Sequence, residues 1–286
     1  MKVLLIGKNG QLGKEIDQQS KKKEYEVYSF GREELDITNW KVVKSKIEDI
    51  KPDTIVNASA FHVVRQCEDE PEQAFLINAI TLKRIAEICS EKNIKFVTYS
   101  TDYVFDGIKG SPYEESDMSN PLQIYGLSKL AGEYITLNYS TTGIVVRTCG
   151  VYGGEEGSRS KKGNFALSIL RQAKKERVIE VSSEQIVNPT YAVDLAKATL
   201  DLLTHEEIAG IYHLVNEGYC SWAEFASEII KAKGLFTKII PVDRKGMAGS
   251  LKRPLFSALK NTRAKKLGIE LPSWQDALKR YISTLS

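Results

Sequence analysis

The sequence predicts an α/β protein with a doubly wound parallel sheet, joined to a smaller C-terminal α/β part. Short apolar runs rich in branched side chains, typical of buried parallel strands, alternate with helical patterns up to residue 147. After Gly150 the pattern becomes irregular, beginning with a glycine-rich, charged loop expected from Gly153 to Gly163. The strands expected in the first part are Lys2–Ile6, Glu26–Phe30, Asp53–Asn57, Lys95–Tyr99 and Gly143–Arg147.

Length and composition are those of an ordinary globular protein. The 286 residues, 42% hydrophobic and 27% charged, can bury one large core or two modest ones. Because 40 basic and 37 acidic residues give a net charge of only +3, no nucleic-acid or membrane partner is expected. The four cysteines and three histidines show no ligand spacing, so no metal site is expected. Unpaired cysteines and the lack of a signal or membrane-spanning stretch predict a cytoplasmic protein.

A glycine-rich turn follows the first strand directly. Gly7, Gly10 and Gly13, spaced G-x-x-G-x-x-G, stand between the strand Lys2–Ile6 and a helical pattern. In this context free backbone N–H groups and the helix dipole form a site for a pyrophosphate. The spacing therefore predicts dinucleotide binding.

Cofactor choice depends on the end of the second strand. Folds that bind NAD usually carry an acidic residue there, which holds the ribose 2′-hydroxyl. Here the strand ends at Arg32, which suits a 2′-phosphate and favours NADPH, while Glu33 and Glu34 follow closely and leave NADH open. The expected cofactor contacts are Gly7, Gly10, Gln11, Leu12, Gly13, Arg32, Asp36, Ile37, Ala58, Ala60, Phe61, Tyr99, Tyr125 and Lys129.

Two domains are expected from this organisation. Residues 1–150 form the dinucleotide-binding domain, to which the chain returns around residues 176–204. Residues 151–286 form mainly the substrate domain. Within the first domain a long helix is expected from Pro71 to Ser90. We interpret Asn78 on this helix as a structural residue, with a functional role as the alternative.

Three side chains that suit proton transfer follow the fourth strand. The strand Lys95–Tyr99 delivers Thr101 at its carboxyl end, where ligands bind in open α/β sheets. Tyr125 and Lys129 are four residues apart on a helix expected to open at Asn120-Pro121, so they share one face. A phenol with a pKa of about 10 is a poor acid at neutral pH, and a nearby ammonium is expected to lower the pKa of Tyr125. The spacing thus predicts a tyrosine that acts as general acid.

The same residues belong to an ordered set of motifs that covers nearly the whole chain. In this set the sequence resembles the extended short-chain dehydrogenases/reductases, which have a Rossmann-like fold, and among them the dTDP-4-dehydrorhamnose reductase family. The motifs are G-x-x-G-Q-L-G from Gly7, N-A-S-A from Asn57, S-T-D-Y-V-F-D-G from Ser100, Y-G-x-S-K-L-x-G-E from Tyr125, R-T from Arg147, G-N-F from Gly163, P-T-x-A-V-D-L-A from Pro189 and R-P-x-x-S from Arg253.

The resemblance implies an NAD(P)H-dependent reduction. The nicotinamide would donate hydride to the C4 keto carbon of a nucleotide-linked 6-deoxyhexulose, with dTDP-4-dehydrorhamnose as the leading candidate and surface polysaccharide as the destination of the product. Tyr125 would protonate the developing alkoxide, and Thr101 would hydrogen-bond the same oxygen. Lys129 would lower the pKa of Tyr125 and bind the nicotinamide ribose. The resemblance leaves a homodimer open.

Substrate contacts are expected from Thr101, Asp102, Gly150, Asn164 and Arg253. By the resemblance, Asp102 would contact or orient the sugar, and Asn164 and Arg253 would bind the diphosphate. Family members typically read R-T-S-W-V-Y-G, whereas Gly150 stands here at the tryptophan position. This departure leaves the expected reaction class unchanged, but it leaves the identity of the sugar open.

Two further departures bear on the choice of reaction. Tyr103 follows Thr101-Asp102 where related dehydratases have a glutamate, which counts against dehydration. The segment Phe61 to Arg65 differs from the usual A-Y-T-A-V-D and puts His62 near the cleft. The alternatives are a reductase or epimerase of another nucleotide sugar, and a non-catalytic regulatory subunit similar to that of methionine adenosyltransferase.

Overall fold

The computed structural model describes residues 1–156, 163–243 and 251–285 of the chain. The strands of its main sheet are β1 (Lys2–Ile6), β2 (Glu26–Phe30), β3 (Thr54–Asn57), β4 (Lys95–Thr101), β5 (Gly143–Thr148) and β10 (Gly210–His213). They lie in the order β10-β5-β4-β3-β1-β2, and every neighbouring pair is parallel. Since the chain moves from β1 to β2 and then crosses back to β3, the sheet is doubly wound, as the sequence predicts.

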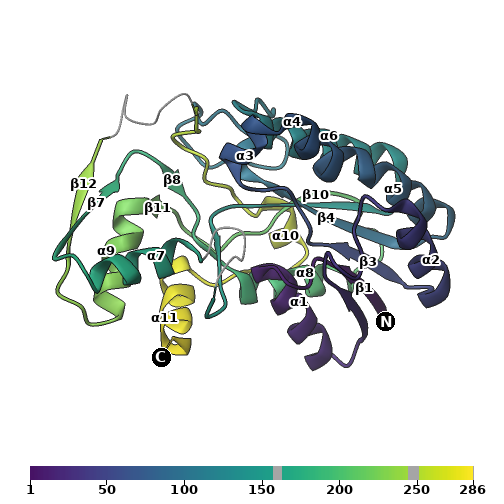
Figure 1. The fold of residues 1–286 in the computed structure, drawn as a ribbon, viewed down its shortest axis with the longest axis horizontal. Helices are drawn as coiled ribbons and strands as arrows, with labels where there is room; N and C mark the ends of the chain where they lie inside the picture. Colours follow the sequence, from purple (N-terminus) through teal and green to yellow (C-terminus); the bar gives the residue numbers. More distant parts are fainter. Residues whose placement is uncertain (157–162, 244–250, 286) are drawn as a thin grey trace.

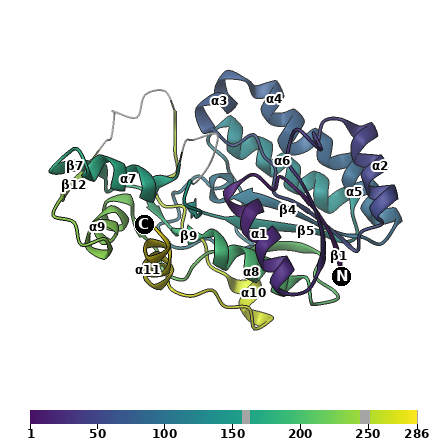
Figure 2. The ribbon, with the colours of Figure 1, turned by 60° about the horizontal axis from the view of Figure 1, so that its bottom comes forward.

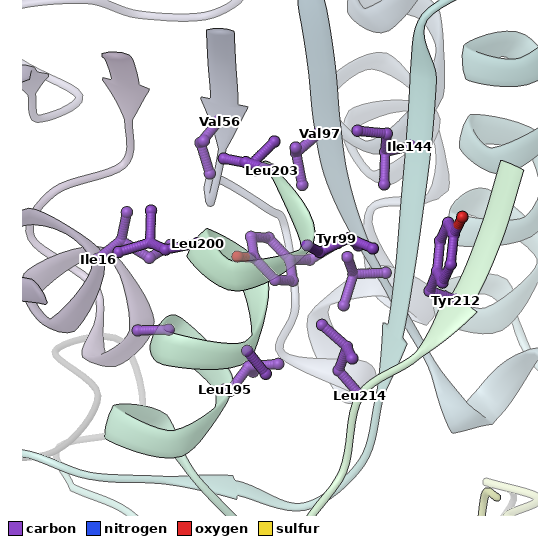
Figure 3. Packing of buried hydrophobic residues seen from close by; sticks show 14 of the residues in the cluster. Ile16, Val56, Val97, Tyr99, Ile144, Leu195, Leu200, Leu203, Tyr212 and Leu214 are labelled. Atoms are coloured by element: carbon purple, nitrogen blue, oxygen red, sulfur yellow. The ribbon is translucent and has the colours of Figure 1, made fainter. Parts of the chain in front are cut away.

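Helices cover both faces of this sheet (Figures 1 and 2). One face packs against α2 (Trp40–Ile50), α5 (Thr81–Glu91) and α6 (Ile124–Tyr139), and the other against α1 (Gln11–Lys22) and α8 (Ala192–Leu202). Between the sheet and the second pair, Tyr99 packs with Ile16, Leu195 and Leu200 (Figure 3). The central strands are therefore buried on both sides, which explains why they read as continuous apolar runs.

The helix expected from Pro71 to Ser90 is interrupted by a π-helical turn. The chain passes from α4 (Pro71–Phe75) through η1 (Leu76–Ile80) into α5. Asn78 lies in this turn and is buried. Its side chain accepts from Phe61 N at 2.9 Å and donates to Phe61 O at 2.8 Å and to Ser128 Oγ at 3.0 Å. Because these bonds join the segment after β3 to α6, the structural interpretation of Asn78 is confirmed.

A smaller part of the molecule contains short strands and further helices. β11 (Cys220–Ser221) pairs with β8 (Ile186–Val187), β12 (Lys238–Val242) with β7 (Val178–Ser182), and β6 (Val151–Tyr152) with β9 (Thr190–Tyr191). The helices of this part are α7 (Phe165–Ala173), α9 (Trp222–Ala232) and α11 (Trp274–Thr284). Elsewhere, α3 (Val64–Asp69) lies against α6, and α10 (Thr262–Lys266) packs on β10 of the main sheet. An aromatic core holds this part together, with Tyr152, Tyr191, Phe225, Trp274 and Tyr281 in mutual contact.

The chain returns to the main sheet late in the sequence. α8 packs against α1, and β10 pairs with β5 as the sixth strand, whereas β7 pairs with β12 in the smaller part. We propose that residues 1–150, α8 and β10 form one domain and that the remainder forms mainly the substrate domain. Of the loop expected from Gly153 to Gly163, residues 157–162 lie outside the described residues. The described helices include none with the length and apolar character that crossing a membrane requires.

Candidate active site

The turn after β1 forms a cradle at the N-terminus of α1. Gly10 is the N-cap of α1 and has no side chain with which to cap the N–H groups of the first turn. A Cβ on Gly13 would overlap the Gly7 carbonyl, so this turn is closed on one side. A Cβ on Gly10 would meet only Gly7 O, at 3.6 Å, and would fill the open side of the cradle. Uncapped N–H groups that face such a space suit a dinucleotide pyrophosphate.

Residues expected near the adenosine lie in different surroundings. Arg32 is exposed at the end of β2, with Nε 3.6 Å from Asp36 Oδ2. Asp36 also accepts hydrogen bonds from Thr38, which lower the pKa of its carboxyl although burial acts in the other direction. The side chain of Ile37 packs into the core beneath. Tyr99 is likewise a core residue, since its hydroxyl donates to Thr199 Oγ1 at 2.9 Å and its ring lies between the sheet and α8 (Figure 3).

A cavity of about 780 Å³ opens where the two parts meet. The main-sheet domain contributes side chains from the α1 N-terminus, the end of β4 and the start of α6, and the other walls come from α7, β7, α9 and the segment near Arg253. Of the predicted site residues, the cavity is lined by Gln11, Thr101, Asp102, Tyr125, Gly150, Asn164 and Arg253. His62, expected near the cleft, also lines it.

The helix that carries Tyr125 and Lys129 is held closely against its neighbours. α6 begins at Ile124 rather than at Asn120-Pro121, because Gln123 caps it and accepts from Gly126 N at 2.7 Å. A Cβ on Gly126 would overlap the carbonyl of Tyr103, and one on Gly132 would overlap that of Asn78. These two glycines therefore let α6 approach the end of β4 and the π-helical turn, which brings its catalytic candidates to the strand ends.

A buried ion pair fastens the same helix to the sheet. Glu133 on α6 accepts from Arg147 Nε at 2.9 Å and from Arg147 Nη2 at 2.6 Å, and it also accepts from the hydroxyl of Ser100. Both charged side chains are at most 3% exposed. Sequence reasoning assigned no role to this glutamate, although it closes the motif that begins at Tyr125. Removing either partner would leave a buried charge unpaired, so the pair fixes the position of α6 on β4 and β5.

Tyr125 and Lys129 have pKa values shifted by burial in opposite directions. Desolvation raises the pKa of the Tyr125 phenol, and Asp102 raises it further, while the Thr101 hydroxyl lowers it. Burial lowers the pKa of Lys129 to about 8, against the opposing effect of Glu133. The expectation that the ammonium lowers the pKa of Tyr125 is therefore wrong for the net shift in this structure, because desolvation of the phenol dominates.

Lys129 is buried, and Glu133 on the same helix is the main charge that opposes the effect of burial on its pKa. Its side chain is 5% exposed, and within the described ranges it makes no hydrogen bond or ion pair. Its Nζ has three protons to donate. A buried ammonium in this condition suits a hydroxyl-bearing ligand, as expected for the ribose of a nicotinamide cofactor.

Asp102 is engaged by the protein rather than turned freely toward the cavity. Its Oδ2 accepts from Ser257 Oγ at 2.6 Å, and its Oδ1 lies 3.0 Å from Thr101 Oγ1. The side chain is 4% exposed, and burial raises the pKa of its carboxyl. Ser257 was seen in the sequence only as the last residue of the R-P-x-x-S motif. In the structure, the hydrogen bond from Ser257 to Asp102 holds this motif against the end of β4.

Asn164 is a capping and bridging residue in this structure. Its Oδ1 accepts from Leu167 N at 2.9 Å and caps α7, while its Nδ2 lies within 3.2 Å of Gln11 Oε1, Gly153 O and Tyr281 Oη. The amide is therefore occupied by the protein, in contrast to the expected contact with a diphosphate. Gln11, expected at the cofactor, is the partner that links the glycine turn to α7.

Arg253 presents its guanidinium to the cavity, near Tyr103. It is exposed in the cavity wall and makes no ion pair with any residue that the structure describes. Arg171, which sequence reasoning missed, lines the same cavity from α7. Phe165 and Trp222, with ring centroids 4.5 Å apart, add an aromatic wall. Their meeting had no signal in the sequence, because they come from the starts of two separate helices.

Gly150 has a backbone that only glycine adopts easily. Its φ is +55°, and a Cβ would lie 2.8 Å from the carbonyl oxygen of Asn188. Its own carbonyl accepts from Thr190 N at 3.2 Å. The segment that enters β6 is thus held close to β9, and no side chain projects into the cavity from this position.

Comparison with known proteins agrees with this geometry. The family model described as RmlD substrate binding domain matches residues 1–286. The spore coat polysaccharide biosynthesis protein SpsK of Bacillus subtilis is 37% identical over 100% of this chain and 98% of its own. The dTDP-4-dehydrorhamnose reductase of Aggregatibacter actinomycetemcomitans is 35% identical over 97% of each chain. The crystal structure of dTDP-4-dehydrorhamnose reductase from Bacillus anthracis in complex with NADP has a TM-score of 0.92 at 33% identity and covers 99% of both chains.

Proposed function

The chain belongs to the RmlD substrate binding domain family and is a nucleotide-sugar reductase, and from this premise we propose that it reduces dTDP-4-dehydrorhamnose to dTDP-L-rhamnose. NADPH is the preferred cofactor, and the product serves as a precursor of surface polysaccharide. The observation that carries the proposal is the convergence of Thr101, Tyr125 and Arg253 on one cavity beside the cradle at Gly10. The relatives named as dTDP-4-dehydrorhamnose reductases support this choice of substrate.

Residues in the cavity and beside it divide the work of the reaction. When bound, the dihydronicotinamide supplies a hydride to the C4 carbon of the sugar. Tyr125 donates its phenolic proton to the C4 oxygen as that oxygen gains negative charge. Lys129 binds the nicotinamide ribose. Arg253 binds the diphosphate, for which its guanidinium is well suited. The N–H groups after Gly10 hold the pyrophosphate of the cofactor.

The test is NADPH oxidation, followed by absorbance, with a panel of nucleotide-linked 4-keto sugars. We expect turnover with dTDP-4-dehydrorhamnose, and we expect Tyr125→Phe to abolish it while NADPH binding persists. Tyr103→Phe is the matched control, because this second phenol lies in the same cavity with its ring centroid 6.1 Å from that of Tyr125. It should lower kcat by no more than about tenfold. Unchanged turnover in Tyr125→Phe would contradict the general-acid assignment.

A second candidate is a reductase that acts on a different nucleotide-linked 4-keto sugar. Two observations favour it: Gly150 stands at the position where family members typically have a tryptophan, and the chain is similar to a spore coat polysaccharide protein. Both bear on the identity of the sugar and not on hydride transfer. Turnover confined to another member of the panel would select this candidate. An epimerase would consume no net NADPH, and a non-catalytic subunit would bind the cofactor without turnover.

A further inference from the structure

We propose that Asp102 is a positioning residue that works in its protonated form, donating to Thr101 so that the Thr101 hydroxyl is free to donate to the substrate oxygen. The proposal rests on the proposed function for the identity of that oxygen. The roles expected for Thr101, Tyr125 and Lys129 do not specify which atom holds each hydroxyl proton, and the proposal concerns that question. Asp102 itself touches neither the sugar nor the cofactor in this account.

A count of protons shows why the charge of the carboxyl matters. Thr101 has one hydroxyl proton, and its oxygen also accepts from Tyr103 N at 3.2 Å. If Asp102 were ionised, both of its oxygens would act only as acceptors, and the proton of Thr101 would be directed to Oδ1 at 3.0 Å. Thr101 would then have nothing to offer a developing alkoxide. A protonated carboxyl reverses the direction of this bond.

The second carboxyl oxygen determines where the proton resides. Ser257 Oγ donates to Oδ2 at 2.6 Å, so Oδ2 is occupied as an acceptor. A carboxyl proton on Oδ1, the oxygen that faces Thr101, leaves Oδ2 free to accept this bond. Ser257 is itself fixed, since its N–H donates to Ile186 O at 2.9 Å. The carboxyl therefore links the end of β4 to the segment that carries Arg253.

The surroundings of Asp102 favour the neutral carboxyl. Thr101, Asp102 and Ser257 are each at most 6% exposed. The titratable groups that face the carboxyl are Tyr103, Tyr125 from α6 and Cys149 after β5, whose thiol also hydrogen-bonds the carboxyl; all three are uncharged when protonated. Among the described residues, no lysine, arginine or histidine pairs with it. An ionised carboxylate here would be buried without a cation, which is strongly unfavourable.

Isosteric substitution separates the two charge states. Asp102→Asn supplies an N–H donor for Thr101 and an oxygen acceptor for Ser257, so it imitates the protonated carboxyl. We expect its kcat to stay within about threefold of wild type. Asp102→Ala should lower kcat by about a hundredfold, because Thr101 loses its orienting partner. If Asp102→Asn loses as much as Asp102→Ala while both still bind NADPH, an ionised carboxylate is required and the proposal is overturned.

Two further measurements exclude a purely structural role. Thr101→Val combined with Asp102→Ala should be no slower than Thr101→Val alone, since Asp102 acts through Thr101; additive losses would contradict this. In the wild-type protein, the ¹³C NMR signal of the Asp102 carboxyl should be that of a protonated acid at pH 7. A signal of an ionised carboxylate would overturn the proposal without any variant. This signal does not depend on the substrate, so absence of turnover with dTDP-4-dehydrorhamnose would count against the proposed function alone.

Discussion

Gly150→Ala tests how firmly the backbone is held beside the sugar site. The φ of +55° at Gly150 costs a residue with a Cβ about 1 kcal/mol. The added Cβ would lie 2.8 Å from Asn188 O, and Thr190 N holds the segment in place through its 3.2 Å hydrogen bond to Gly150 O. Overpacking of this kind adds about 1–3 kcal/mol. We therefore expect the free energy of unfolding to fall by about 2–4 kcal/mol.

A second glycine isolates the contribution of the close contact. Gly234 has a φ of +67°, but no atom lies within 4 Å of a Cβ built there, so Gly234→Ala should cost only the backbone term of about 1 kcal/mol. Urea unfolding of both variants, with equal m-values, gives the difference directly. Equal midpoints for the two variants would refute the reasoning. In activity assays Gly150→Ala should raise the KM for the sugar nucleotide and leave NADPH binding unchanged.

Three other predictions concern the cofactor side of the cavity. Gly10→Ala should weaken NADPH binding by more than about tenfold with little change in stability. Gly13→Ala should instead lower stability, because its Cβ overlaps the Gly7 carbonyl. The melting temperature and the Kd for NADPH distinguish the two variants. Arg32→Ala should weaken NADPH about fivefold and leave NADH unchanged, and a parallel loss for both cofactors would contradict a 2′-phosphate contact. Because burial lowers the folded pKa of Lys129 to about 8 from 10.5, the unfolded state binds more protons between these values and stability rises with pH there. Unfolding at pH 8 and 9.5 should show a gain of about 2 kcal/mol in wild type that Lys129→Met lacks.

The sequence was informative where one residue type suits one local conformation. Apolar runs located five strands of the sheet, and the turn between β1 and α1 was recognised from its glycines. The sixth strand, Gly210–His213, was not predicted, because the chain reaches it only after passing through the smaller part, outside the alternation of strands and helices that located the other five. The π-helical turn at Leu76–Ile80 was missed because its residues are ordinary helix formers. Tertiary contacts of Asn78 with Phe61 and Ser128 accompany this turn, and such contacts have no sequence periodicity.

The electrostatics of the site could not be read from spacing. Tyr125 and Lys129 do share a face of α6, but the sign of their pKa shifts depends on how deeply α6 is buried. That depth comes from Gly126 and Gly132, which allow the helix to approach other backbone carbonyls, and from the ion pair of Glu133 with the sheet. The spacing identified Tyr125 and Lys129, while the packing of α6 determined the direction of their pKa shifts.

The two predicted diphosphate ligands show how topology decides which partner a side chain meets. The resemblance names both Asn164 and Arg253 as diphosphate ligands, because they match the G-N-F and R-P motifs. In the fold, the amide of Asn164 caps α7 and bridges Gln11 to Tyr281, which leaves it no unused donor for a ligand. Arg253 makes no ion pair within the described part of the chain and lines the cavity. A diphosphate would therefore draw its charge-assisted bonds from Arg253, while Asn164 fixes the position of α7 relative to the glycine turn.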